Sequence, residues 1–294
     1  MRGGPGRRMA ELLHISDLHF GPPFLRDRAE AVLELARDVP IDAVVVSGDL
    51  TQRAKPRQFR EAAEYLDRFG VPVVVVPGNH DVPLWRVWER FFAPYRHYRR
   101  HISPELDTVT RIDGMTLVAL NSSRSFTITN GRLEESQLAF AAEAFAGAPE
   151  DDLRVVVTHH HLAPPPDFAT DSVMPKAKRA LRAFRDQGVD LVLAGHMHRA
   201  YVGDSLDFFP GGDREEGIVI VQCGTTTSAR GRGRERFNNS LNYLRTSGKS
   251  LEVAHYLWRD RARGFWPHSR HRFGLSPEIW MDRPDRPFGE DGGS

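Results

Sequence analysis

Residues 71–81 read VPVVVVPGNHD, an apolar run that ends in glycine, asparagine, histidine and aspartate. Residues 43–49, AVVVSGD, have the same form. A short β-branched run bounded by turn residues is typical of a buried strand. Between the two runs, residues 57–69 carry apolar side chains at helical spacing. The order strand, helix, strand predicts parallel strands joined by crossover helices.

The same alternation extends along most of the chain, which predicts an α/β protein. Helical spacing recurs over 26–39, 134–145 and 176–187. Because the strands are apolar on both faces, we expect their sheets to be covered on both sides. The further predicted strands are 12–15, 116–120, 153–157, 191–194, 218–222, 241–245 and 251–258.

The two chain ends differ in composition from the middle. Residues 1–10 are rich in glycine and arginine, and residues 282–294 have few apolar positions. We therefore expect a flexible extension over 1–10, one folded domain over 11–281 and a loose tail over 282–294.

Charge and cysteine content exclude several classes of protein. With 40 Lys+Arg and 39 Asp+Glu the formal charge is +1, which argues against a strongly basic nucleic-acid-binding domain but leaves a local basic groove open. The only cysteine, Cys223, excludes an intramolecular disulfide and fits a reducing compartment. No apolar run reaches about 18 residues, so we expect no membrane span and a cytoplasmic location.

Polar clusters follow five of the predicted strands. Because ligands of open α/β sheets bind outside the carboxyl ends of the strands, we expect these clusters to face one rim. Each cluster alone has an ordinary interpretation as a turn or a helix cap, but five such clusters after five strands favour a metal site. The clusters are Asp17-x-His19, Gly48-Asp49, Gly78-Asn79-His80-Asp81, His159-His160-His161 and Gly195-His196-x-His198.

The residue types suit manganese, iron or zinc, which bind oxygen and imidazole ligands. A single carboxylate that bridges two ions would give each ion four protein ligands and leave room for water. Two ions about 3.5–4 Å apart can activate a water molecule and hold the oxygens of an in-line displacement at phosphorus. The seven candidate ligands are Asp17, His19, Asp49, Asn79, His159, His196 and His198.

With these five clusters in this order, residues 11–260 resemble the calcineurin-like metallophosphoesterase superfamily. Within it, Ser-Asp-Leu-His at 16–19 and Gly-Asp-Leu-Thr at 48–51 are most similar to small bacterial phosphodiesterases of the cyclic-nucleotide type. The resemblance implies a four-layer α/β/β/α sandwich of two mixed sheets, with a dinuclear metal site at the carboxyl edge of the strands. It also implies two divalent or mixed-valence ions of manganese, iron or zinc.

The resemblance assigns a role to each cluster residue. It implies that Asp49 bridges the two ions and that His80 is not a ligand but faces the scissile phosphate, with Asp81 orienting its ring. One ion would be held by Asp17, His19, Asp49 and His198, and the other by Asp49, Asn79, His159 and His196.

The chain departs from the family pattern at two places. Gln52 stands where the longer form Gly-Asp-x-x-Asp has its last aspartate, which alters the support of the site but not the ligand set. His159-His160-His161 stands where many relatives have His-His-Pro. We prefer His159 as the ligand because it is nearest the strand end; His160 and His161 are left with either a substrate contact or a surface role.

Two segments near the clusters bear on the substrate. Residues 84–100 interleave aromatic side chains with arginines, and we favour an amphipathic helix with its aromatics in the core. The alternatives are a lid whose aromatics stack a base and whose arginines hold phosphate oxygens, or a dimer face. Residues 224–236 contain four arginines and form either a disordered basic loop or a phosphate-contacting loop.

These observations favour a metal-dependent phosphodiesterase that acts on a small, nucleotide-like phosphoester, without a membrane partner. A phosphomonoesterase or nuclease on the same metal core is the alternative enzyme, because a fold does not separate these activities. A non-catalytic metal-binding module is the alternative of another class, and His80, which is surplus to coordination, argues against it. Nucleic-acid binding is open but not favoured, and the sequence does not set the oligomeric state.

Overall fold

The computed structural model describes residues 9–112, 114–164, 173–205, 217–247 and 250–274. The expected tail over 282–294 lies outside these ranges, as do residues 1–8 of the expected extension. The expectation of a flexible extension is wrong for Met9 and Ala10, because these two residues begin the first strand and Ala10 is buried.

Twelve strands form two mixed six-stranded sheets in the described part of the chain. In the first sheet β1, β2 and β3 are parallel, and β10, β11 and β12 extend it antiparallel from β1. Its order is β12 (Gly264–Gly274), β11 (Ser250–Arg259), β10 (Ser240–Ser247), β1 (Met9–Ile15), β2 (Ala43–Val46), β3 (Val73–Val75).

In the second sheet β5, β6, β7 and β9 are parallel, and the edge strands β4 and β8 are antiparallel to their neighbours. Its order is β4 (Thr108–Ile112), β5 (Met115–Ala119), β6 (Leu153–Val157), β7 (Leu191–Ala194), β9 (Val219–Gln222), β8 (Tyr201–Asp204). The strands β4, β8 and β12 have no counterpart among the strands predicted from the sequence.

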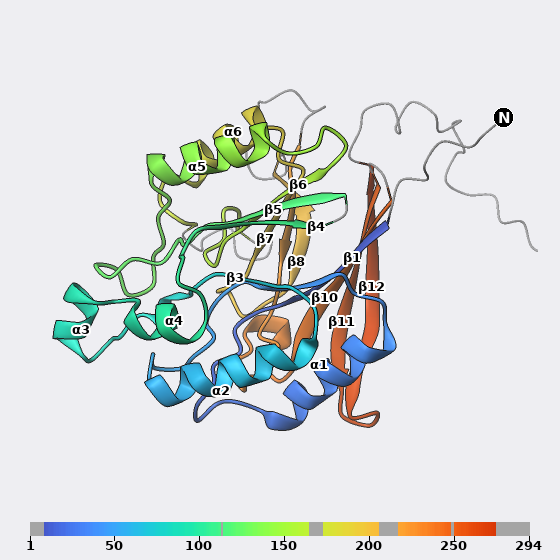
Figure 1. Ribbon diagram of the computed structural model, residues 1–294. Coiled ribbons are helices and arrows are strands. Elements are labelled where there is room, and N and C mark those ends of the chain that lie inside the picture. Colours follow the sequence, from blue (N-terminus) through green and yellow to red (C-terminus); the bar gives the residue numbers. More distant parts are fainter. Residues whose placement is uncertain (1–8, 113, 165–172, 206–216, 248–249, 275–294) are drawn as a thin grey trace, which may run out of the picture.

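Four helices cover the two outer sheet faces, and Figure 1 shows them on opposite sides of the paired sheets. Helices α1 (Arg26–Asp38) and α2 (Pro56–Leu66) lie on the first sheet, and α5 (Glu135–Ala146) and α6 (Ala177–Asp186) lie on the second. Each buries a stripe at helical spacing; in α6 the stripe is Ala177, Ala180, Leu181 and Phe184.

The alternation of side chains along each strand produces three apolar layers. Leu12 and Val45 point between the two sheets, whereas their neighbours Leu13 and Val44 point toward α1 and α2. In the second sheet Val155 points toward the first sheet, and Val156 packs beneath α5 and α6. These layers confirm the expected four-layer α/β/β/α sandwich.

The aromatic segment 84–100 forms two short helices, α3 (Val87–Phe92) and α4 (Arg96–His101). The expectation that its aromatics fill the core is wrong for the first half. Trp88 is 79% exposed and Phe92 77% exposed, whereas Arg90 is buried. The guanidinium of Arg90 donates to the carbonyl oxygens of Pro83 and Thr127, which satisfies the buried charge with backbone acceptors. In α4, by contrast, Tyr98 is fully buried.

Candidate metal centre

All five polar clusters follow strands that end at the same edge of the two sheets. The clusters at 17–19, 49 and 79–81 follow β1, β2 and β3 of the first sheet, and those at 159–161 and 196–198 follow β6 and β7 of the second. Hydrogen bonds connect the two groups across the sheets: the Nδ1–H of His159 donates to the carbonyl oxygen of Ser47 over 2.8 Å.

Five of the seven candidate ligands have a left-handed backbone. Their φ angles are positive and lie between 52° and 75°, a region that non-glycine residues seldom adopt. Such strain persists only where the surrounding structure enforces it, and it is concentrated at functional sites. The five are Asp17, His19, Asp49, His196 and His198.

Threonines after β9 hold the first of these turns. The hydroxyl of Thr225 donates to the carbonyl oxygen of Asp17 over 2.7 Å, and that of Thr227 donates to Leu18 over 3.0 Å. Both threonines are fully buried. Of the two alternatives for residues 224–236, the disordered loop is therefore wrong for the first half.

The first cluster brings together Asp17, His19, Asp49 and His198. The Nε2 atoms of His19 and His198 lie 3.0 Å apart, and His198 Nε2 is 3.1 Å from Asp17 Oδ1. Asp17 Oδ1 is buried and accepts no hydrogen bond from the described residues. A buried carboxylate oxygen without a donor, facing two imidazole nitrogens, is an arrangement that a cation completes.

The second cluster brings His159 and His196 against Asn79. His159 Nε2 and His196 Nδ1 are 3.2 Å apart, and each lies 3.1 Å from Asn79 Oδ1. The side-chain amide of Asn79 donates to the carbonyl oxygen of Ile128, which turns Oδ1 toward the histidines. Ligand atoms about 2.1 Å from one ion and at right angles lie about 3.0 Å apart, so this spacing fits a shared ion.

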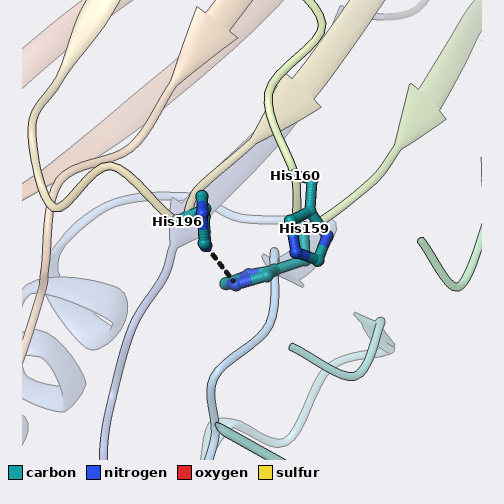
Figure 2. A group of neighbouring side chains, drawn as sticks. All are labelled: His159, His160 and His196. Carbon is teal, nitrogen blue, oxygen red and sulfur yellow. Dashed lines mark hydrogen bonds between the residues drawn. The ribbon is translucent and has the colours of Figure 1, made fainter. Parts of the chain in front are cut away.

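His160 also lies in this cluster, and Figure 2 shows the three rings of His159, His160 and His196 together. The Nδ1 atom of His160 is 2.8 Å from the hydroxyl of Ser122. Only His159, however, contacts both Asn79 Oδ1 and, at 3.5 Å, Asp49 Oδ1. These contacts favour His159 as the ligand. The surface alternative for His160 and His161 is wrong, because both are buried.

Asp49 lies between the two clusters with one oxygen toward each. Its Oδ2 is 3.6 Å from His19 Nε2, and its Oδ1 is 3.5 Å from His159 Nε2. Burial alone would raise the pKa of Asp49, but the neighbouring histidines, His159 foremost, lower it to about 2. The carboxylate is therefore ionised, with one oxygen toward each cluster.

Two of the candidate histidine ligands, His19 and His196, are held in the neutral form that binds metal. Burial lowers the pKa of His19 and of His196 to about 3, so both rings are neutral near pH 7. The Nδ1–H of His198 donates to the carbonyl oxygen of Arg230 over 2.7 Å, which leaves Nε2 for a cation. These backbone acceptors, Ser47 and Arg230, carry no signal in the sequence.

His80 is beside both clusters without joining either. Its backbone N–H donates to Asp49 Oδ1 over 2.8 Å, and its ring packs edge-on against His19 with centroids 4.8 Å apart. The Nδ1–H donates to the carbonyl oxygen of Gln52 over 3.0 Å. His80 Nε2 accepts a hydrogen bond from Arg230 Nη1 over 3.1 Å.

Asp81 has partners other than those the resemblance implied. We expected it to orient the ring of His80, but its four described hydrogen bonds come from Leu50, Thr51 and Gly78. Three are backbone N–H donors and one is the hydroxyl of Thr51. Burial and the neighbouring Asp49 raise its pKa to about 7. Asp81 thus joins the turn after β2 to the turn after β3, and Gln52 orients the ring.

Glycines are required where these turns approach each other. A Cβ atom on Gly48, whose φ is +96°, would lie 2.5 Å from His159 Nδ1. A Cβ atom on Gly78 would overlap the carboxylate of Asp49. Both turns therefore depend on a residue without a Cβ atom.

A sequence profile of the calcineurin-like phosphoesterases matches residues 10–200 of the chain. The chain belongs to this family. Members of this family have dinuclear metal sites, which agrees with the two clusters on either side of Asp49.

Curated relatives are similar over part of their length. A cAMP/cGMP dual specificity phosphodiesterase of Mycobacterium tuberculosis is 31% identical over 205 residues, which are 64% of this chain and 61% of that protein. The 3′,5′-cyclic adenosine monophosphate phosphodiesterase CpdA of Escherichia coli is 30% identical over 138 residues, 45% of this chain and 46% of CpdA.

Solved structures agree on the fold. A purple acid phosphatase from yellow lupin superposes on 96% of this chain and 57% of its own, with a TM-score of 0.67 and 12% identity. A dimetal phosphatase from Danio rerio covers 91% of this chain and 99% of its own, with a TM-score of 0.61 and 13% identity. Within the described ranges, no helix is both long and apolar enough to cross a membrane.

Proposed function

We propose that this protein is a metal-dependent phosphodiesterase that hydrolyses a small, nucleotide-like phosphodiester. The observation that carries the proposal is the position of Asp49, whose two carboxylate oxygens face two separate groups of ligand atoms. Two ions held in this way lower the pKa of a water molecule and neutralise charge on the phosphoryl oxygens.

We assign one ion to Asp17, His19, Asp49 and His198, and the other to Asp49, Asn79, His159 and His196. Nitrogen and oxygen ligands suit manganese, iron or zinc. The buried, donor-free Oδ1 of Asp17 and the spacing of about 3 Å between ligand atoms support this set.

His80 is the proposed catalytic residue. Its Nδ1–H is engaged by Gln52, so Nε2 is the nitrogen presented to the substrate. When Nε2 also carries a proton, the ring so fixed can donate a hydrogen bond to the phosphoryl group or to the leaving oxygen. Asp81 is a positioning residue in this proposal, because it holds the turns that carry Asp49 and His80.

A nucleobase would find aromatic side chains next to the centre. A small pocket of about 80 Å³ is lined by residues that include Asn79, His80 and Ile128. In the loop that supplies Ile128, Phe126 is 83% exposed and packs on Phe91, with ring centroids 5.6 Å apart. Exposed aromatic rings bind bases by stacking. The cyclic-nucleotide names of the relatives support this substrate class.

Charge and cysteine usage support the remaining assignments. A formal charge of +1 favours a small substrate over a long nucleic acid, whose binding draws on many cationic contacts. The single, buried cysteine supports a cytoplasmic location.

The test is hydrolysis of bis(p-nitrophenyl) phosphate by metal-stripped protein that is reloaded with Mn²⁺, Fe²⁺ or Zn²⁺. We expect turnover that requires metal and that is lost in Asp49→Ala but kept in Asp38→Ala, a matched change at an exposed aspartate. Faster turnover of p-nitrophenyl phosphate would favour a phosphomonoesterase. Two bound ions without turnover of either ester would favour the non-catalytic module.

The nucleotide part is tested separately with 3′,5′-cyclic AMP. Phe126→Ala should raise KM about tenfold, since stacking on an aromatic ring contributes about 1–3 kcal/mol per base. Trp266→Ala, at an exposed tryptophan on β12, is the control. Equal KM values for the two variants would contradict a stacked base at Phe126.

A further inference from the structure

The guanidinium of Arg230 lies against His80 at the metal centre. Its Nη1 donates to His80 Nε2 over 3.1 Å and to the side-chain oxygen of Gln52 over 3.0 Å. The carbonyl oxygen of the same residue accepts the Nδ1–H of His198. Arg230 is therefore fixed to the centre by its backbone, and its half-buried side chain faces the same space as His80 Nε2.

No carboxylate is paired with this guanidinium in the salt bridges of the described ranges. Burial lowers the pKa of Arg230, and the positive charges of Arg232 and Arg53 act in the same direction. The opposing charges are those of Asp49 and Asp17, both of which face the proposed ions. Cations bound at these two carboxylates would neutralise the negative charges that act on Arg230. A partly buried cation in this position favours an incoming anion.

Gln52 gives this arrangement its particular character. An aspartate in the last position of Gly-Asp-x-x-Asp would form a salt bridge with Arg230 and neutralise it. The amide oxygen of Gln52 instead fixes the guanidinium and leaves its charge available. The backbone carbonyl of Gln52 also orients His80, so a single residue sets both side chains.

We propose that Arg230 binds a non-bridging oxygen of the substrate's phosphoryl group and that Gln52 is the residue that positions it. In the absence of substrate, Nη1 donates to His80 Nε2. On binding, the phosphoryl oxygen replaces this acceptor, and Nε2, after it takes up a proton from water, donates to the leaving oxygen. This inference rests on the proposed function for the identity of the ester but requires only a bound phosphate anion for its test.

The test measures binding of inorganic phosphate to metal-loaded protein by calorimetry, with metal content determined on the same samples. Arg230→Gln should weaken phosphate binding about ten- to a hundredfold, the usual effect of one charged hydrogen bond, with two ions still bound. Arg230→Lys should recover part of this loss, because it restores the charge without the planar fork. Arg236→Gln, at an exposed arginine of the same segment, should change binding less than about threefold.

Gln52→Asp distinguishes positioning from simple packing. We expect it to weaken phosphate binding and raise KM with a smaller effect on kcat, because a salt bridge to Arg230 neutralises the anion site. Gln52→Glu should also weaken phosphate binding and raise KM. Unchanged phosphate affinity in both Arg230→Gln and Gln52→Asp, with two ions bound, overturns the inference.

The outcomes also separate the inference from the proposed function. If wild-type protein binds phosphate through Arg230 but hydrolyses no diester, the proposed function fails and the anion site stands. If diesters are hydrolysed and Arg230→Gln has wild-type phosphate affinity, KM and kcat, the function stands and the inference fails. If Arg230→Gln loses metal, the phosphate affinity of Gln52→Asp decides the question instead. This variant keeps the backbone contact of residue 52 to His80.

Discussion

Replacement of Asp81 tests whether this residue braces the centre or acts on His80. Each of its oxygens accepts two hydrogen bonds: Oδ1 from the N–H and hydroxyl of Thr51, and Oδ2 from the N–H groups of Leu50 and Gly78. Asp81 is only 1% exposed, so no solvent replaces a lost acceptor. The perturbation is a pair of variants, Asp81→Asn and Asp81→Ala.

Both variants remove the ionisable carboxyl group of Asp81. The difference between their stabilities therefore contains no contribution from its raised pKa. The amide oxygen of asparagine still accepts from Leu50 and Gly78, and its NH₂ group finds the hydroxyl of Thr51, leaving one N–H without a partner. Alanine leaves three. The difference is two buried N–H groups, each costing about 1–3 kcal/mol when unsatisfied, or about 2–6 kcal/mol in all.

The assay is urea unfolding of both variants, followed by circular dichroism, with bound metal measured in parallel. We expect Asp81→Ala to be less stable than Asp81→Asn by this amount and to bind less metal, because the turns that carry Asp49 and Asn79 separate. A difference below about 1 kcal/mol would refute the bracing argument. Loss of turnover in both variants, with stability and metal content intact, would instead support the role expected from the resemblance.

Three further predictions follow from the same contacts. Asp49→Ala should abolish binding of both ions, whereas Asp17→Ala should remove one, as measured by the metal content of purified protein; two ions in Asp49→Ala would contradict the bridge. Burial, together with His268 and His271, lowers the pKa of His255 to about 4, so the folded state disfavours the charged ring. The stability that the neutral ring of His255 contributes is therefore lost as the pH falls below about 6.5. Between pH 7 and 5 this amounts to about 2 kcal/mol, and His255→Gln should reduce the acid loss in urea unfolding by that amount; an unchanged pH dependence would argue against it. Gly48→Ala should lower the free energy of unfolding by about 1–2 kcal/mol through backbone strain and by about 1–3 kcal/mol through overlap with His159. Gly70→Ala, where φ is +68° and no heavy atom lies within 4 Å, should show only the strain. Equal losses of stability in the two variants would contradict the close approach at Gly48.

Much of the fold could be predicted because its signals are local. The runs at 43–46 and 191–194 are apolar on both faces, and such runs form strands buried between two layers. The strands that sequence analysis missed lie at sheet edges. Most of β12 is exposed, and its sequence, GFWPHSRHRFG, has no alternation that distinguishes it from a loop; its pairing with β11 makes it a strand.

The helix α3 shows how tertiary contacts reverse a local expectation. Interleaved aromatics and arginines predicted apolar side chains in the core. Instead Arg90 is buried, because the carbonyl oxygens of Pro83 and Thr127 meet its guanidinium, and the aromatic rings are exposed. Hydrophobic spacing cannot reveal this, since one of the two acceptors, Thr127, lies 37 residues away in the chain.

The sequence by itself determined which residue types follow each strand, because each turn is a short, continuous segment. The motifs of the family lie within these turns. Only the tertiary structure decided how those residues meet. His19 and His198 are 179 positions apart, yet their Nε2 atoms lie 3.0 Å from each other because β1 and β7 end at one edge of two packed sheets. The orientation of the His80, His159 and His198 rings and three of the four hydrogen bonds to Asp81 depend on backbone groups that every residue carries. Their positions are set by packing and not by the identity of neighbouring residues.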